Sequence, residues 1–174
     1  LEAMPPEMME NLRKEFGLDK PIIIQYFNWI IGIAQGDFGT SIFYREKVST
    51  LMAERFPVTL HLGLSSFILG AFLGLIFGLL AAVRRGKWPD KVITPLTYIG
   101  ICIPVFWLGI LLIYTFGLKF NLLPIVGYTS PFVDPWLSFK QTIMPVFCLT
   151  LFSLAANARQ MRSSMLETVG EDYI

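Results

Sequence analysis

The residues that most often carry chemistry are sparse in this chain. It holds one histidine, His61, and two cysteines, Cys102 and Cys148, and its acidic residues do not gather around them. Such a set builds neither a metal site nor a catalytic triad. The sequence also lacks the HExxH, GxSxG, CxxC and GxxxxGKS/T motifs. We therefore expect a chain that is not itself an enzyme and that holds no metal or cofactor.

Among the polar residues of the stretch 141–158, Ser153 and Asn157 are candidates for a transport path. Ser153 and Asn157 are four positions apart and would share one face of a helix. Polar groups at membrane depth are functional candidates, although hydroxyls and amides also simply join helices. His61 lies near the end of another apolar stretch, and we expect it to be structural. No Asp, Glu, Lys or Arg lies within the apolar stretches, which disfavours proton- or sodium-coupled transport.

Small residues also recur at a regular spacing. Four glycines recur at intervals of seven, four and four residues: Gly63, Gly70, Gly74 and Gly78. This spacing keeps them on one stripe of a helix, where small residues let another helix backbone approach closely. We therefore expect a helix-packing stripe, without a direct role in binding a solute.

The elements that position these residues are expected to be membrane-spanning helices. The chain has 174 residues, of which 54% are hydrophobic and only 16% charged. A soluble domain carries about 25% charge. Uncharged stretches cover 59–83, 92–116 and 141–158, and the first two are long enough to cross a hydrocarbon core of about 30 Å. We predict an all-α, polytopic membrane protein with helices at about 59–83, 92–116 and 141–160.

The first 57 residues are expected to form a separate, small helical segment outside the membrane. Short helical pieces are predicted at 5–16, 21–34 and 47–56, with a turn at GDFGTS, 36–41. The stretch 21–34 is apolar but short for a crossing. We therefore divide the chain into an extracytoplasmic segment, 1–57, and a partial transmembrane domain, 58–174.

The distribution of basic residues predicts the orientation. The loop 84–91 contains Arg84, Arg85, Lys87 and Lys91, whereas the longer stretch 117–140 contains only Lys119 and Lys140. By the positive-inside rule, 84–91 and 159–174 are cytoplasmic and 1–58 is outside. Because no signal peptide begins the chain, we expect further segments before Leu1 and after Ile174. The formal net charge of +1 gives no reason to expect a nucleic-acid partner.

Four ordered motifs resemble a known family. They are EFGLDKPIIIQYFNWIIGIAQGDFGTS (15–41), RFPVTLHLGLSSFILGAFLGLIFGLLAAVRRGKWPDK (55–91), IPVFWLGILLIYTFGLKFNLLPIVGY (103–128) and RQMRSSMLETVGEDYI (159–174). Together they resemble the dipeptide/oligopeptide branch of binding-protein-dependent ABC transporter permeases over essentially the whole chain.

The resemblance implies a type I ABC importer in a bacterial or archaeal plasma membrane. Such a permease has about six helices in the lipid bilayer, of which this chain would supply helices two to four. Its partners would be a second homologous permease, two ATP-binding subunits that use ATP-Mg, and an extracytoplasmic solute-binding protein. The coupling loop would follow Ile174. The residues leading toward it would be Arg162, Ser164, Met165, Leu166, Glu167, Glu171, Asp172 and Tyr173.

The expected function is therefore translocation of di- or oligopeptides, driven by ATP hydrolysis in separate subunits. Within the same class, nickel chelates or glutathione remain alternative solutes, because nothing in the sequence recognises a ligand. A passive channel or an assembly scaffold without ATP coupling is the alternative from another class. An intramembrane enzyme would need an ionisable or metal-binding cluster, which the apolar stretches lack.

Overall fold

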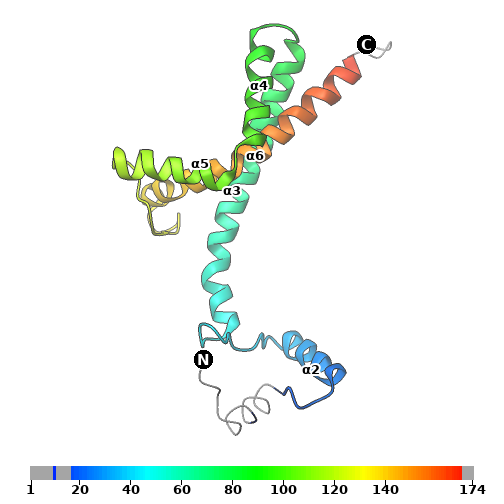
Figure 1. Cartoon of the computed structure of the whole chain (residues 1–174), viewed down its shortest axis with the longest axis vertical. Helices are drawn as coiled ribbons and strands as arrows, with labels where there is room; N and C mark the ends of the chain where they lie inside the picture. The colour runs from blue at the N-terminus through cyan, green and yellow to red at the C-terminus, as the bar shows by residue number, and fades with distance from the viewer. Residues whose placement is uncertain (1–9, 11–16, 170–174) are drawn as a thin grey trace. The chain divides into compact units, whose positions relative to one another are not determined.

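The computed structural model describes residue 10 and residues 17–169. Its elements are α2 (Ile22–Ala34), α3 (Val48–Val83), α4 (Trp88–Cys102), α5 (Val105–Leu112), the π-helix η1 (Ile113–Lys119) and α6 (Pro135–Val169) (Figure 1). The described residues form helices and no strand, apart from an isolated bridge between Thr40 and Lys47. This all-helical architecture confirms the predicted fold class. The chain divides into two compact units, Leu1–Phe56 and Pro57–Ile174.

In the first unit, α2 confirms the short apolar helix expected at 21–34. It begins directly after Pro21, and its side chains are partly or largely exposed. The turn that follows is closed by the Asp37 carboxylate, which accepts a hydrogen bond from the Gly39 N–H at 2.9 Å. The helix expected at 5–16 lies outside the described residues.

Helix α3 is longer than predicted. The two helices expected at 47–56 and 59–83 form one continuous helix that contains Pro57. The expectation of two separate helices is wrong, because an interior proline removes one backbone donor and strains the helix without having to end it.

The expectation of a single helix over 92–116 is also wrong. Helix α4 ends at Cys102 and α5 begins at Val105, with 99° between the two axes. Ile103 lies between them in an extended conformation, with ψ at 122°. Pro104 favours this break, because the ring of a proline disfavours helical geometry at the preceding residue.

Helix α6 contains the expected stretch 141–160 and extends it in both directions. The Asp134 carboxylate accepts a hydrogen bond from the Leu137 N–H at 2.9 Å, which satisfies a donor in the first helical turn. Helices α3 and α6 are each long and apolar enough to cross a membrane. The bent pair Trp88–Cys102 and Val105–Lys119 makes a third crossing only if it is counted as one span.

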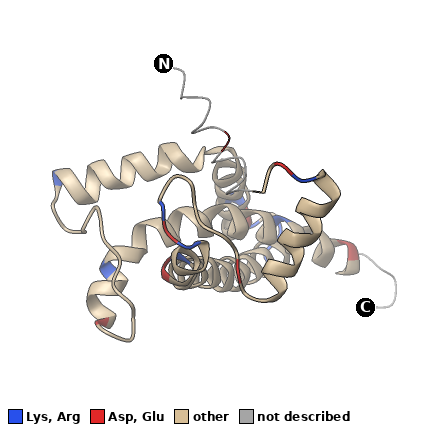
Figure 2. Cartoon of the chain, turned by 90° about the horizontal axis from the view of Figure 1, so that it is seen from below, with Lys and Arg blue, Asp and Glu red and all other residues tan. Residues whose placement is uncertain are grey.

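In the second unit, α4 runs beside the end of α3 and α6 crosses both (Figure 1). The helices meet through small side chains, since Ala81, Ala82, Ala155 and Ala158 are all buried. Figure 2 shows that the ribbons are mostly free of charged residues, which gather at helix ends and in loops. The long helices therefore expose mainly apolar side chains along their middle portions.

Candidate functional site

Helices α3 and α6 contact each other at three of the four glycines in the predicted stripe. A Cβ atom added at Gly70 would lie 2.8 Å from the Ser153 Cβ, and one at Gly74 would lie 2.6 Å from the Asn157 Cβ. At Gly78 the added atom would lie 2.5 Å from the Ala158 carbonyl oxygen. Carbon atoms do not approach their neighbours so closely, so no larger residue fits without a shift of α6.

The fourth glycine lies outside this contact. At Gly63 an added Cβ would meet nothing within 4 Å. Gly63 precedes Gly70 by about 10 Å along the helix axis, and two crossing helices touch over a limited length only. Among the described residues, the part of the stripe that contacts α6 therefore runs from Gly70 to Gly78 and does not include Gly63.

The two polar path candidates face the glycine stripe. Ser153 lies against Gly70 and Asn157 against Gly74, and the Asn157 side-chain amide donates to the Ser153 hydroxyl at 3.2 Å. Both side chains are half-buried. Nearby, the Thr150 hydroxyl donates to the Ser66 carbonyl of α3 at 3.4 Å. In this structure these polar groups lie where α3 and α6 join.

An ion pair between a buried carboxylate and a half-buried guanidinium links α4 to α6. The Arg162 Nε donates to Asp90 Oδ1 at 2.8 Å, and the Arg162 Nη2 donates to Asp90 Oδ2 at 3.1 Å. The same carboxylate accepts from the Thr94 hydroxyl and from the Gly86 N–H, each at 2.9 Å. Asp90 is only 7% exposed, so its charge depends on these four donors for the solvation that water would otherwise supply.

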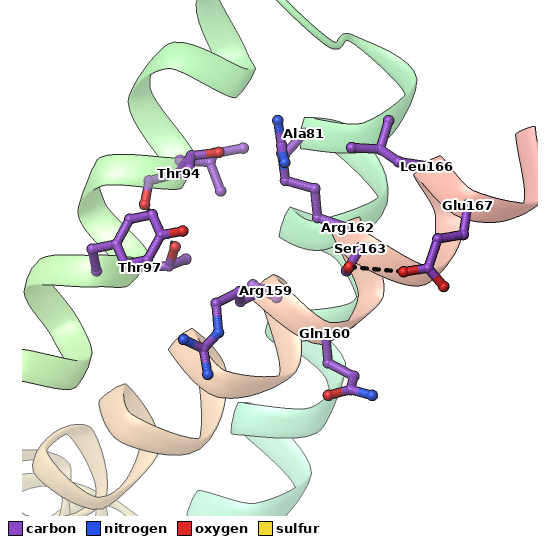
Figure 3. Close-up of a pocket in the computed structure, with 12 residues that line it drawn as sticks. Ala81, Thr94, Thr97, Arg159, Gln160, Arg162, Ser163, Leu166 and Glu167 are labelled. Atoms are coloured by element: carbon purple, nitrogen blue, oxygen red, sulfur yellow. Dashed lines mark hydrogen bonds between the residues drawn. The ribbon is translucent and has the colours of Figure 1, made fainter. Parts of the chain in front are cut away.

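A cavity of about 520 Å³ lies beside this ion pair, between α3, α4 and α6 (Figure 3). Its polar lining comes from both helices: Thr94, Thr97 and Tyr98 on α4, and Arg159, Gln160, Arg162, Ser163 and Glu167 on α6. The Ser163 hydroxyl donates to the Glu167 carboxylate at 3.3 Å, which holds that carboxylate along the α6 surface. The cavity has the size of a small-molecule site.

The residues expected to lead toward the coupling loop lie along the last turns of α6. Arg162, Leu166 and Glu167 line the cavity, Ser164 is exposed and Met165 is half-buried. The remaining three, Glu171, Asp172 and Tyr173, lie outside the described residues. The structure thus brings part of the predicted set to one end of the bundle.

The residue that sequence reasoning missed is Asp90, which lies in the basic loop 84–91. The only local signal is Thr94 four positions later, which could have indicated a bonded carboxylate. Its arginine partner is distant in the sequence, and no periodicity predicts that pairing. His61 joins α3 to the stretch between η1 and α6, since its Nδ1 lies 3.1 Å from the Tyr128 hydroxyl.

Two family profiles match the chain. One, described as "Binding-protein-dependent transport system inner membrane component", matches residues 74–174. The other, described as "Binding-prot-dependent transport system membrane comp, N-term", matches residues 2–63.

Curated relatives match nearly all of this chain. The dipeptide transport system permease protein of Lactococcus lactis subsp. cremoris is 37% identical over 98% of this chain and 54% of its own length. The glutathione transport system permease protein of Salmonella choleraesuis is 38% identical over 97% of this chain and 52% of its own. A Brucella abortus relative, provisionally named a peptide transport system permease protein, is 38% identical over 99% of this chain and 55% of its own length. The chain spans about half the length of the curated relatives it matches.

Proposed function

Because this chain belongs to the family of binding-protein-dependent transport system inner membrane components, we propose that it is part of the permease subunit of an ATP-driven peptide importer. The observation that carries the proposal is the match over 74–174, which covers the end of α3, the bent pair α4 and α5, and α6. The names of the relatives from Lactococcus lactis and Brucella abortus support peptides as the solute class.

The proposed assembly contains a second permease, two ATP-binding subunits and an extracytoplasmic solute-binding protein. The family description itself refers to a binding protein and to an inner membrane, which supports the last partner and the location. Hydrolysis of ATP-Mg belongs to the ATP-binding subunits. The part of the chain that the structure describes brings no three His, Cys, Asp or Glu side chains together as metal ligands.

In the proposed orientation, 84–91 and 159–174 are cytoplasmic and 1–58 is outside. Two observations support it. The loop 84–91 has four basic residues. The Asp90–Arg162 ion pair also holds this loop and the end of α6 at the same end of the second unit, as one cytoplasmic face requires. A bilayer separates charged segments in this way, because charges at its centre are costly.

Transport would proceed by alternating access. The close α3–α6 contact at Gly70, Gly74 and Gly78 favours movement of these helices as one body, because tightly packed helices resist separation. ATP binding by the partner subunits would rock this body and expose a central path first to one side and then to the other. Glutathione is a second candidate solute, favoured by the Salmonella choleraesuis relative, and it is itself a small peptide.

The test is uptake by the full-length parent protein, reconstituted in proteoliposomes with its second permease, ATP-binding subunits and solute-binding protein. Uptake of a labelled dipeptide should require ATP-Mg inside the compartment that holds the ATP-binding subunits. Competition with unlabelled glutathione, and then with an unrelated sugar, measures solute class. Dipeptide uptake that continues at the same rate without ATP would indicate a passive channel and would overturn the proposal.

A further inference from the structure

We propose that Asp90 and Arg162, with Gly86 and Thr94, form a rigid joint that makes the loop 84–91 move together with the end of α6. We call these four residues the Asp90 joint. The inference rests on the proposed function, since it assigns a way in which movement at the end of α6 reaches a second segment of the permease.

The hydrogen bonds of the Asp90 joint connect two segments, the end of α6 and the continuous stretch from Gly86 to Thr94, which holds the loop and the first turns of α4. Asp90 Oδ1 accepts from Arg162 on α6 and from Thr94 on α4, whereas Asp90 Oδ2 accepts from Arg162 and from the Gly86 N–H in the loop. Each carboxylate oxygen therefore binds Arg162 on α6 and one residue four positions away from Asp90 in its own stretch. Turning the carboxylate away from one donor would disturb its bonds to the other donors, because paired arginine–carboxylate bonds restrict the orientation of the carboxylate.

Burial makes separation of the joint unfavourable. The Asp90 side chain is 10% exposed and that of Arg162 is 28% exposed. If α6 moved away from α4, the largely buried carboxylate would lose its counterion, which is more costly than breaking an exposed ion pair. A force on α6 is therefore expected to move the end of α6 and the loop 84–91 together.

Packing on both sides of α6 supports the same conclusion. Toward α3, the Gly78 position lies against the Ala158 carbonyl oxygen. Toward α4, a Cβ at Gly100 would lie 3.3 Å from the Ala155 Cβ. Arg162 follows Ala158 by one turn, so the ion pair adds a further contact between α4 and α6 beside the cavity. Movement passes between two segments only through a physical contact that involves both of them. The Asp90 joint is such a contact between the loop and the end of α6.

The first experiment uses the full-length complex in proteoliposomes and compares R162Q, D90N/R162M and the control K91Q. The R162Q variant leaves the buried carboxylate without its counterion, and should lower both the yield of assembled complex and uptake. In D90N/R162M the buried charges are gone, while the introduced side-chain amide retains an acceptor oxygen and the methionine fills the space of the arginine stem. Lys91 is exposed and adjacent, so K91Q removes one positive charge outside the joint.

The result expected for D90N/R162M is recovered assembly and ATP hydrolysis without recovered uptake. A merely structural ion pair predicts something different, because assembly and uptake would recover together. Wild-type uptake by D90N/R162M would therefore overturn the proposal. K91Q should assemble, hydrolyse ATP and transport like the wild type, and a loss of uptake in K91Q equal to that in R162Q would also overturn it.

A second measurement does not depend on any joint variant. Spin labels at Lys87→Cys and Thr168→Cys, in a Cys102→Ser background, report the distance between the loop and the end of α6. This distance should be the same in the nucleotide-free and ATP-trapped complex, while a label pair from Thr168→Cys to the second permease should change. If the distance between the labels at positions 87 and 168 changed in a complex that transports, the rigid Asp90 joint would be refuted and the proposed function would stand. A wild type without ATP-driven uptake would instead refute the proposed function.

Discussion

Buried polar residues in this chain have different consequences depending on their partners. Asp90 is charged, is 7% exposed and has four donors, so removing any one of them alters a balanced set of bonds. Ser153 and Asn157 are neutral and lie against glycines of α3. For neutral groups between helices, the usual contribution is modest, about 0.6 kcal/mol for an interhelical hydrogen bond. The charge therefore makes Asp90 the more sensitive residue.

The glycines allow a prediction at single positions. Gly74→Leu should lower the yield of assembled, full-length complex, because even a Cβ at that position would lie 2.6 Å from the Asn157 Cβ. Ile68→Leu on the same helix should have little effect, since Ile68 is 61% exposed. Size-exclusion chromatography of the detergent-purified complex measures both. Equal yields for the two variants would contradict the close contact.

A matched pair of smaller substitutions separates packing from helix propensity. Gly63→Ala should be neutral or should stabilise the protein, since alanine is favoured over glycine in a helix by about 1 kcal/mol and nothing lies within 4 Å. Gly74→Ala gains the same propensity but meets α6, so it should lower the melting temperature. Thermal unfolding of the purified complex tests the difference, and a higher melting temperature for Gly74→Ala than for Gly63→Ala would argue against the stripe.

At the scale of elements, the break between α4 and α5 is the feature that most changes the picture of this chain. An uninterrupted run of apolar residues folds as two helices at 99°, and the second continues into the π-helix η1. Irregular backbone of this kind is tolerated at membrane depth where protein surrounds it or water reaches it. The break therefore indicates that this region packs against other protein or borders a water-filled path.

Pro104 should be responsible for the break. In Pro104→Ala, Ile103 becomes free to adopt helical geometry, so α4 and α5 should straighten and the distance between labels at Leu96→Cys and Ile110→Cys should increase toward about 21 Å, the length of a straight helix over that span. Pro95→Ala is the matched control, since Pro95 lies inside α4 and not at the break. Pulsed electron spin resonance measures both distances. An unchanged distance in Pro104→Ala would show that tertiary contacts impose the bend.

At the scale of the whole molecule, the proposed orientation follows from two ends with different chemistry. One end of the second unit contains the basic loop 84–91 and the last turns of α6. The stretch that joins η1 to α6 has exposed apolar side chains such as Phe132 and Val133. Because lysine and arginine favour the cytoplasmic side, the first end should face the cytoplasm.

Cysteine labelling of intact cells tests this orientation in the full-length protein. In a Cys102→Ser background, Lys87→Cys should react with an impermeant maleimide only after the membrane is permeabilised. Val133→Cys, in the stretch after η1, should react from outside without permeabilisation. Reaction of Lys87→Cys in intact cells would invert the topology and would contradict an importer with cytoplasmic ATP-binding subunits.

The sequence alone determined the fold class, because a long uncharged apolar stretch can satisfy its backbone groups in lipid only as a helix. It also indicated the short helix at 21–34, because that apolar run starts at a proline and is too short to cross the bilayer. These features depend on residues close together in the chain, so hydropathy and spacing are sufficient to find them.

Only the tertiary structure decided which of these residues meet. Gly63 and Gly74 have the same spacing pattern, yet only Gly74 touches α6, because where two helices cross depends on their relative placement. Nothing in the sequence pairs Asp90 with Arg162, which lies 72 residues later, and only the packing of α6 places the two side chains together. Such pairings join segments far apart in the chain, and their free energy comes from burial and from charge neutralisation, which exist only once the helices have packed.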